Sequence, residues 1–310
     1  MFGIRFSKTG ALELMWSVIR GLLVTGLCFI ILYPLFVRFS VSFMTVEDMF
    51  DASVQFIPRD FTLENFYIAW EYMDYPRTFF NTLLLVGSVS LFQLLSCTLV
   101  GYGFARYRFR GIGIIFALVI FTLVVPPQLV MMPLFLNFRF FNPFGIFGET
   151  GINLLGSYWP FILMALTATG LRNGLYIYIM KQHFRGMPDT LEEAAYVDGA
   201  GPFKTFFKIM LPGAGPVLII VFLFSFVWQW NDTFFLRLFL RDAEGFLAHA
   251  LRTFPDRFFR DLGFMRGIPE QYNDVVENAG ILMFMAPLIV VYLTLQRYFI
   301  ESVERTGIVG

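Results

Sequence analysis

Long runs without a charged side chain alternate with polar segments along this chain. Six such windows span residues 21–37, 78–105, 111–138, 150–171, 209–231 and 278–296. A helix needs about 20 apolar residues to cross the hydrocarbon core of a bilayer, where it satisfies its own backbone hydrogen bonds. One charge at the centre of such a helix costs roughly 2.5–3.5 kcal/mol on insertion scales. The pattern therefore predicts an all-α integral membrane protein with six transmembrane helices.

Two windows contain features that change the expected helices. Residues 173–180 are again uncharged, so we expect the fourth span to cover residues 150–180, and such a helix rises about 46 Å at about 1.5 Å per residue. Arg172 then lies inside the span, where its side chain either snorkels or occupies a cavity near the inner face. In the third window, Pro126-Pro127-Gln128 frees backbone carbonyl groups and predicts a kink rather than a binding site.

The distribution of basic residues orients the spans. Three arginines, Arg106, Arg108 and Arg110, crowd the short connection between the second and third windows, whereas the next short loop has only Arg139. Because lysine and arginine in short loops favour the cytoplasmic side, both termini are predicted to be cytoplasmic. We expect a cytoplasmic segment at 1–20 and one transmembrane domain at 21–310, with spans at 21–37, 78–105, 111–138, 150–180, 209–231 and 278–296.

Composition agrees with a membrane protein and narrows the chemistry. Of the residues, 57% are apolar and 15% charged, against roughly 45–50% and 25% in soluble domains. Lysine plus arginine and aspartate plus glutamate each number 23, so no basic surface for nucleic acid is expected. Cys28 and Cys97 form no metal-ligand spacing, and His183 and His249 lie outside the windows. We expect no metal site, no cofactor and no catalytic site in this chain.

The polar segment at 181–208, between the fourth and fifth spans, contains strong helix signals. Thr190 and Glu193 have the spacing of a capping box, which predicts the start of a helix. Gly199 suits the left-handed residue that ends a helix, and Pro202 suits the first turn of the next. The sequence predicts a cytoplasmic helix of about two turns. On these signals alone, an ordinary surface helix between two spans is the favoured interpretation.

The spacing within this segment adds a resemblance. Glu193-Ala194-Ala195, then Gly199, then Ile209-Met210-Leu211-Pro212 resembles the E-A-A-x3-G-x9-I-x-L-P loop of the permease subunits of binding-protein-dependent ABC importers. Later stretches resemble the carbohydrate branch, which includes the maltose-system permeases: Trp230-Asn231-Asp232, Leu240-Arg241-Asp242 and Gln296-Arg297-Tyr298-Phe299. The resemblance identifies the chain as a suspected carbohydrate importer permease.

Several partners follow from this resemblance. In the family, the short helix docks in a cleft of a cytoplasmic ATPase, with Glu193 as the polar contact, Ala194 and Ala195 as the closely packed face and Gly199 as the turn. The residues assigned to ATPase coupling are Glu193, Ala194, Ala195, Asp198, Gly199, Leu211 and Pro212. The chain has no Walker A sequence, so ATP and Mg would bind the partner. The resemblance implies two ATPase subunits, a second permease in a heterodimer, an external solute-binding protein, and a bacterial or archaeal plasma membrane.

The substrate path is predicted from aromatic and amide side chains, because rings stack on sugar faces and amides bind hydroxyls. The candidates are Tyr158, Trp159, Trp228, Gln229, Trp230 and Asn231. An interfacial aromatic belt or helix packing explains the same residues. The outer loop at 232–277 is the candidate surface for the solute-binding protein, or else a solvated surface.

Other functions fit the sequence less well. An ion-coupled secondary transporter of a small polar solute is the main alternative, and such carriers usually keep ionisable residues inside their spans and often contain inverted repeats. A receptor or scaffold would not need the spacing of the cytoplasmic loop.

Overall fold

The computed structural model describes residues 8–170, 172–240, 242–263, 265 and 267–307, and helices dominate this part of the chain. Within it, Phe141 and Ile152 form one isolated antiparallel bridge. The helices are α1 (Lys8–Val41), α2 (Val46–Phe50), α3 (Glu64–Tyr72), α4 (Tyr75–Arg106), α5 (Ile112–Val124), η1 (Pro127–Val130), α6 (Met131–Arg139), η2 (Pro143–Gly145), α7 (Trp159–Leu166), α8 (Asn173–Gly186), α9 (Thr190–Val197), α10 (Pro202–Thr205), η3 (Phe206–Met210), α11 (Leu211–Gly213), α12 (Gly215–Trp230), α13 (Phe234–Phe239), η4 (Ala243–Gly245), α14 (Leu247–Phe258), η5 (Phe259–Gly263), η6 (Glu270–Tyr272) and α15 (Asn273–Gly307). The predicted helical class is confirmed for these residues.

Three described stretches are long and apolar enough to cross a membrane: 12–41 in α1, 75–106 in α4 and 270–297 in η6 and α15. Two further pairs pass the same test together but are bent, α5 with 127–139 by 103° and 202–213 with α12 by 78°. The structure therefore gives three spans, or up to five if each bent pair is one span, and the six predicted spans are only partly recovered. Residues 8–20 already belong to α1, and residues 1–7 of the predicted N-terminal segment lie outside the described residues.

The predicted continuous helix over residues 150–180 is wrong. Only α7 and α8 are helical there, and Ala168 and Arg172, with φ of 55° and 63°, lie in the break between them. The Thr167 hydroxyl donates to the Leu163 carbonyl at 2.8 Å and lies 2.9 Å from the Thr169 hydroxyl. Local bonds of this kind compete with helix continuation, and Gly170 follows directly. The uncharged window is therefore two short helices rather than one long span.

The proline pair of the third window has the predicted effect. α5 ends at Val124, and Pro127 starts the turn η1 that leads into α6. Proline has no backbone N–H and clashes with the preceding helical turn, so the helix cannot run through it. The bend of 103° exceeds an ordinary kink.

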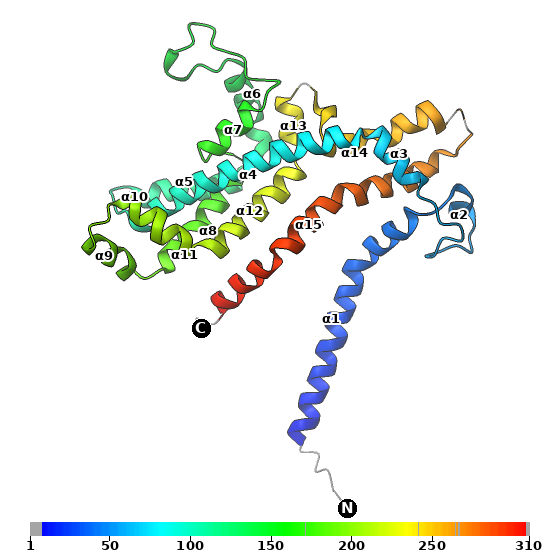
Figure 1. Cartoon of the computed structure of the whole chain (residues 1–310), viewed down its shortest axis with the longest axis horizontal. Helices are drawn as coiled ribbons and strands as arrows, with labels where there is room; N and C mark the ends of the chain where they lie inside the picture. Colours follow the sequence, from blue (N-terminus) through cyan, green and yellow to red (C-terminus); the bar gives the residue numbers. More distant parts are fainter. Residues whose placement is uncertain (1–7, 171, 241, 264, 266, 308–310) are drawn as a thin grey trace, which may run out of the picture. The chain divides into compact units, whose positions relative to one another are not determined.

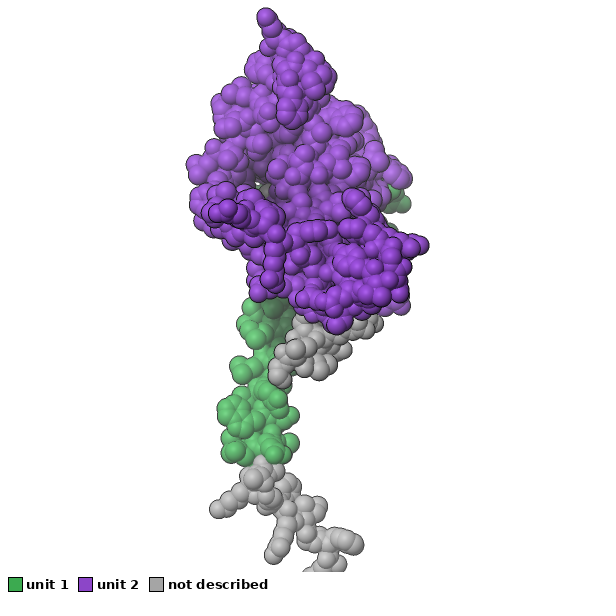
Figure 2. All heavy atoms as spheres, turned by 90° about the vertical axis from the view of Figure 1, so that its left-hand side faces the viewer, with its two compact units in different colours: residues 1–73, 253–283 green, residues 74–252, 284–310 purple. Residues whose placement is uncertain are grey.

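The chain divides into two compact units, Met1–Met73 with Thr253–Met283 and Asp74–Arg252 with Phe284–Gly310, coloured separately in Figure 2. In the first unit, the polar segment after α1 is folded by buried hydrogen bonds. Asn65 donates its amide to the carbonyl groups of Ser42 and Met44, each at 2.9 Å. The Asp48 carboxylate accepts the backbone N–H groups of Arg59 and Asp60. This loop is therefore an ordered structure of its own.

The second unit is organised around α4, which packs against α7, α8 and α12 (Figure 1). Two glycines permit the closest approaches. A Cβ at Gly101 would lie 2.6 Å from the Met180 Cβ, and a Cβ at Gly174 would lie 2.7 Å from the Val119 carbonyl oxygen. Because van der Waals fit rather than water expulsion holds helices together in lipid, these small residues set the distances of α4 from α8 and of α8 from α5.

Candidate functional site

The helix predicted in the cytoplasmic segment is present as α9, but its N-terminus differs from the prediction. Asp189 is the N-cap residue, and neither it nor Thr190 makes a capping side-chain bond. The expected capping box between Thr190 and Glu193 is therefore wrong. The reason is long-range, because the Asp189 carboxylate accepts a hydrogen bond from Arg106 at the end of α4.

The same arginine fastens α9 to α4 through a buried carboxylate. The Tyr102 hydroxyl donates to Glu192 Oε1 at 2.5 Å, and Arg106 Nε lies 3.2 Å from Glu192 Oε2. Arg106 also donates to the Met187 carbonyl at 2.8 Å. The side chains of Arg106 and Glu192 are only 8% and 11% exposed. Glu192 thus holds the helix in place, a role that the sequence did not reveal because two adjacent glutamates look alike.

The C-terminal end of α9 matches the prediction. Gly199 has φ of 77°, and its N–H donates to the Tyr196 carbonyl while the Ala200 N–H reaches back to the Ala195 carbonyl at 2.9 Å. This bond pattern closes a helix through a left-handed glycine. Pro202 then occupies the first turn of α10, as expected.

The outward surface of α9 carries most of the residues assigned to coupling. Glu193, Ala194, Asp198 and Gly199 are exposed, and Val197 is 88% exposed. Ala195 is only 3% exposed, so it packs inside the chain and does not share the outward face with Ala194. An exposed valine beside small residues forms a surface that a partner can approach closely.

Leu211 and Pro212 lie in α11, at the bend that leads into α12. Leu211 is half-buried and Pro212 is exposed. Near this bend, burial lowers the pKa of His183 on α8, and a hydrogen bond with the Gly213 backbone opposes this shift. A Cβ at Gly213 would lie 2.8 Å from the Met187 methyl group. The bend is thus packed tightly against the end of α8.

The aromatic candidates for the substrate path divide by their surroundings. Trp230 is 1% exposed and donates to the Phe284 carbonyl at 3.3 Å, so it serves helix packing. Tyr158 packs its ring against Phe246, and Trp159 is 54% exposed. The Asn231 amide donates to the Val227 carbonyl of its own helix at 2.7 Å.

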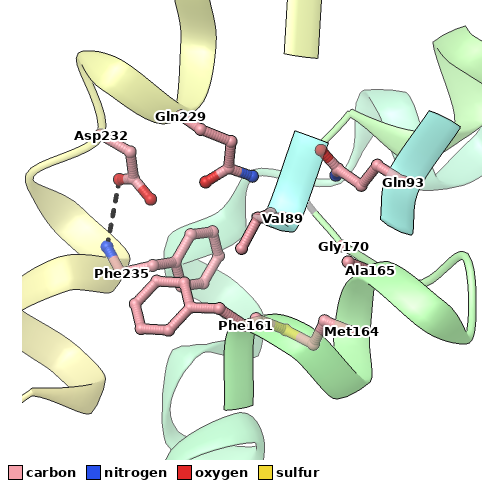
Figure 3. Close-up of a pocket in the computed structure, with 9 residues that line it drawn as sticks. All are labelled: Val89, Gln93, Phe161, Met164, Ala165, Gly170, Gln229, Asp232 and Phe235. Carbon is pink, nitrogen blue, oxygen red and sulfur yellow. Dashed lines mark hydrogen bonds between the residues drawn. The ribbon is translucent and has the colours of Figure 1, made fainter. Parts of the chain in front are cut away.

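Gln229 lines a small, mostly apolar cavity together with Gln93 and Asp232 (Figure 3). Its volume is about 10 Å³, which is space for about one water molecule. Asp232 accepts the backbone N–H groups of Phe234 and Phe235 at 2.9 and 3.1 Å, and burial raises the pKa of its carboxyl group. Sequence reasoning missed Gln93, since one glutamine in an apolar window gives no signal of its partners.

Gln93 joins three helices of the second unit. It donates to Asn173 Oδ1 at the start of α8 and accepts from the Ser225 hydroxyl of α12, each at 2.5 Å. All three side chains are buried. Hydrogen bonds between these buried side chains link the three helices, although Asn173 Nδ2 has no partner among the described residues.

A larger cavity of about 560 Å³ opens beside the break between α7 and α8. α5 and the segment 164–177 contribute most of its lining, which includes Arg172 and Asn173. The Arg172 guanidinium carbon lies 4.3 Å from the centroid of the Trp228 ring. Of the two places expected for Arg172, snorkelling or a cavity, the structure supports the cavity.

Comparison with known proteins agrees with this architecture. Residues 98–305 match the family described as the inner membrane component of binding-protein-dependent transport systems. The arabinooligosaccharides transport system permease protein AraQ of Halalkalibacterium halodurans is 28% identical, covering 92% of this chain and 93% of its own. The maltodextrin transport system permease protein MdxG of Bacillus subtilis is 28% identical, covering 93% and 95%.

A solved structure shows the same fold. It is a chain of a bacterial ABC transporter involved in the import of the acidic polysaccharide alginate, with a TM-score of 0.73 and 22% identity. The match covers 96% of the chain described here and 100% of the other.

Proposed function

The chain belongs to the family of inner membrane components of binding-protein-dependent transport systems, and from this premise we propose that it is the permease subunit of an ATP-driven carbohydrate importer. The family consists of multi-pass membrane components of ABC importers without an ATPase site of their own. The relatives AraQ and MdxG, named for oligosaccharides, support a carbohydrate as the substrate. The family match also argues against the ion-coupled carrier.

We further propose that α9 couples this subunit to a cytoplasmic ATPase. The observation that carries the proposal is an exposed surface of Glu193, Ala194, Asp198 and Gly199 on a helix anchored from behind by Glu192. A helix that transmits force must expose one face and be held by the other. Two ATPase subunits would bind ATP and Mg, and a second, different permease would form a heterodimer with this chain and complete the translocation path.

The remaining partners follow from the same family. An external solute-binding protein would deliver the sugar, and the outer loop at 232–277 is our candidate for its contact. Arg241, Phe264 and Arg266 of that loop lie outside the described residues. The cell membrane would be bacterial or archaeal, with both termini of this chain in the cytoplasm.

The experiment that tests coupling is purification of the tagged chain in mild detergent, with mass spectrometry of every retained protein. We expect an ATPase and a second permease in the wild-type sample, and a weaker ATPase signal for the Glu193→Ala, Gly199→Trp double variant. If the chain emerges alone or as a homo-oligomer, the importer proposal fails.

A transport assay separates coupling from insertion. Gly199→Trp forces a bulky residue into a left-handed backbone, which costs a non-glycine residue about 1–2 kcal/mol. We expect normal membrane insertion and loss of ATP-driven uptake. Gly201→Trp is the matched control, because Gly201 has an ordinary φ of −78° and also has open space around it. Normal uptake by the Gly199 variant would contradict the proposal.

A further inference from the structure

The large cavity beside the break between α7 and α8 contains a single charged residue. Among the described residues that line it, Arg172 is charged and no aspartate or glutamate is present. Arg172 makes no ion pair with any acid in the described part of the chain. An arginine is permanently charged, and within an apolar window such a charge is expensive and marks a functional position by default.

The backbone around Arg172 is also unusual. Ala168 and Arg172 both adopt positive φ, which is uncommon for residues other than glycine. Such conformations persist only where the surrounding structure enforces them, and they concentrate at ligand-binding and switch regions. Irregular backbone at membrane depth is tolerated where protein covers it or where it lines a water-filled cavity. Here the break lines the cavity.

Polar groups suited to a sugar surround the arginine. Thr122 and Thr169 line the same cavity and are exposed. Asn173 is 2% exposed, and its Nδ2 has no hydrogen-bond partner among the described residues. An amide donor left in this state is normally satisfied by a bound molecule or water. The two exposed hydroxyl groups and the guanidinium together suit the hydroxyl and acidic groups of a carbohydrate.

The position of Arg172 on Trp228 leaves its donors available. The guanidinium lies over the ring face, 4.3 Å from the centroid, so its N–H groups around the rim remain free for acceptors in its own plane. Such a planar fork binds carboxylate or phosphate groups with two parallel hydrogen bonds. The positive N-terminus of α8, which begins at Asn173, adds to the attraction of an anion.

We propose that this cavity binds an anionic carbohydrate, with Arg172 contacting its carboxylate or phosphate group. The inference rests on the proposed importer function and narrows its substrate class. A neutral sugar would leave the guanidinium without a counter-charge, whereas an acidic sugar supplies one. The surrounding threonine hydroxyls bind the sugar hydroxyls.

The test measures the charge preference of the cavity in the complete transporter, purified with its ATPase and second permease. Cys28, the exposed cysteine, is replaced by serine, and Thr169→Cys introduces a thiol in the cavity. Anionic and cationic thiosulfonate reagents of similar size then label this thiol. For a nearby guanidinium we expect the anionic reagent to react on the order of ten-fold faster.

Variants at arginine positions test whether Arg172 causes the faster labelling by the anionic reagent. Arg172→Gln should bring the ratio of the two labelling rates close to one, and Arg172→Lys should keep most of it. Arg139→Gln is the matched control, because Arg139 is exposed in the same unit and does not line this cavity. Equal rates for the two reagents while Arg172 is present, or a thiol that neither reagent reaches, would overturn the inference.

Protection by sugars identifies the ligand. Trigalacturonate, glucose 6-phosphate and maltotriose are compared at equal concentration for their ability to slow labelling. Protection by trigalacturonate supports a carboxylate sugar, and protection by glucose 6-phosphate supports a phosphorylated one. Protection by maltotriose as strong as by either anionic sugar, or protection by none, overturns the inference. An ATPase missing from the purified sample would instead contradict the proposed function, so the two failures are distinguishable.

Discussion

At the residue scale, the adjacent glutamates Glu192 and Glu193 differ in their surroundings, because Glu192 is buried and Glu193 is exposed. Glu192→Ala removes the acceptor of the Tyr102 hydroxyl and leaves Arg106 with one acid fewer. Removing one partner of a buried pair costs about 3 kcal/mol or more, although Arg106 keeps its bond to the Met187 carbonyl. We expect faster proteolysis of the segment 187–201 and a lower melting temperature. Glu193→Ala is the matched control and should melt like the wild type, and equal melting of both variants would show that Glu192 does not anchor α9.

A buried carboxylate makes the stability depend on pH. Burial raises the pKa of Asp232 above its ordinary value of 3.8. The folded chain therefore binds this proton more tightly than the unfolded chain, so the stability contribution of the group is full at low pH and declines as the pH rises. We expect Asp232→Asn, which keeps an acceptor for Phe234 and Phe235, to raise the melting temperature at pH 7. The gain should shrink on acidification and vanish at pH values well below the ordinary pKa of 3.8, and a gain that grows on acidification would refute this assignment.

At the residue scale, features that depend on the local backbone could be predicted from the sequence, whereas contacts between residues distant in the chain could not. Gly199 and Pro202 act through their own backbone, so their places at the end of α9 and the start of α10 were predicted. The capping box failed because Asp189 binds Arg106, which is 83 positions away in the chain. No spacing rule within one segment reports such a partner.

Close helix contact can be tested at the element scale. Gly101→Ala places a Cβ 2.6 Å from the Met180 Cβ, so α4 and α8 must separate or shift. We expect a loss of about 1–3 kcal/mol, as for other overpacked cores, seen as a lower melting temperature in detergent. Gly103→Ala on the same helix has no atom within 4 Å and should be neutral. A neutral Gly101 variant would mean that the two helices adjust freely.

The uncharged windows predicted where helices occur more accurately than they predicted whether each helix is continuous. The windows at 21–37, 78–105 and 278–296 correspond to the long helices α1, α4 and α15. The prediction of one continuous helix from the window at 150–171 failed because the Thr167 and Thr169 side chains make local hydrogen bonds that compete with the helix. The absence of charged residues does not indicate such bonds. Pro126 and Pro127 did predict the break in the third window, because proline directly prevents the backbone from continuing the helix.

Topology is the prediction that belongs to the whole molecule. The distribution of lysine and arginine predicts that the segment 181–208 lies inside the cell and the loop at 139–149 outside. In a Cys28→Ser background, Lys204→Cys should react with a membrane-impermeant maleimide only after the cells are opened. Glu149→Cys should react in intact cells. Both positions are exposed in the structure, so labelling from one side at both would refute the predicted orientation.

The anchoring of α9 by Arg106 has a mechanical consequence for the second unit. α4 is one unbroken helix of 32 residues, about 48 Å long at about 1.5 Å per residue. At its far end, Thr82 accepts the Leu247 N–H and Asn81 donates to the Gly245 carbonyl. The α5–α6 path is bent and the α7–α8 path is broken, whereas α4 is continuous. Under the proposed coupling, a displacement of α9 would reach η4 and the start of α14 through α4, which is the continuous helix that joins them.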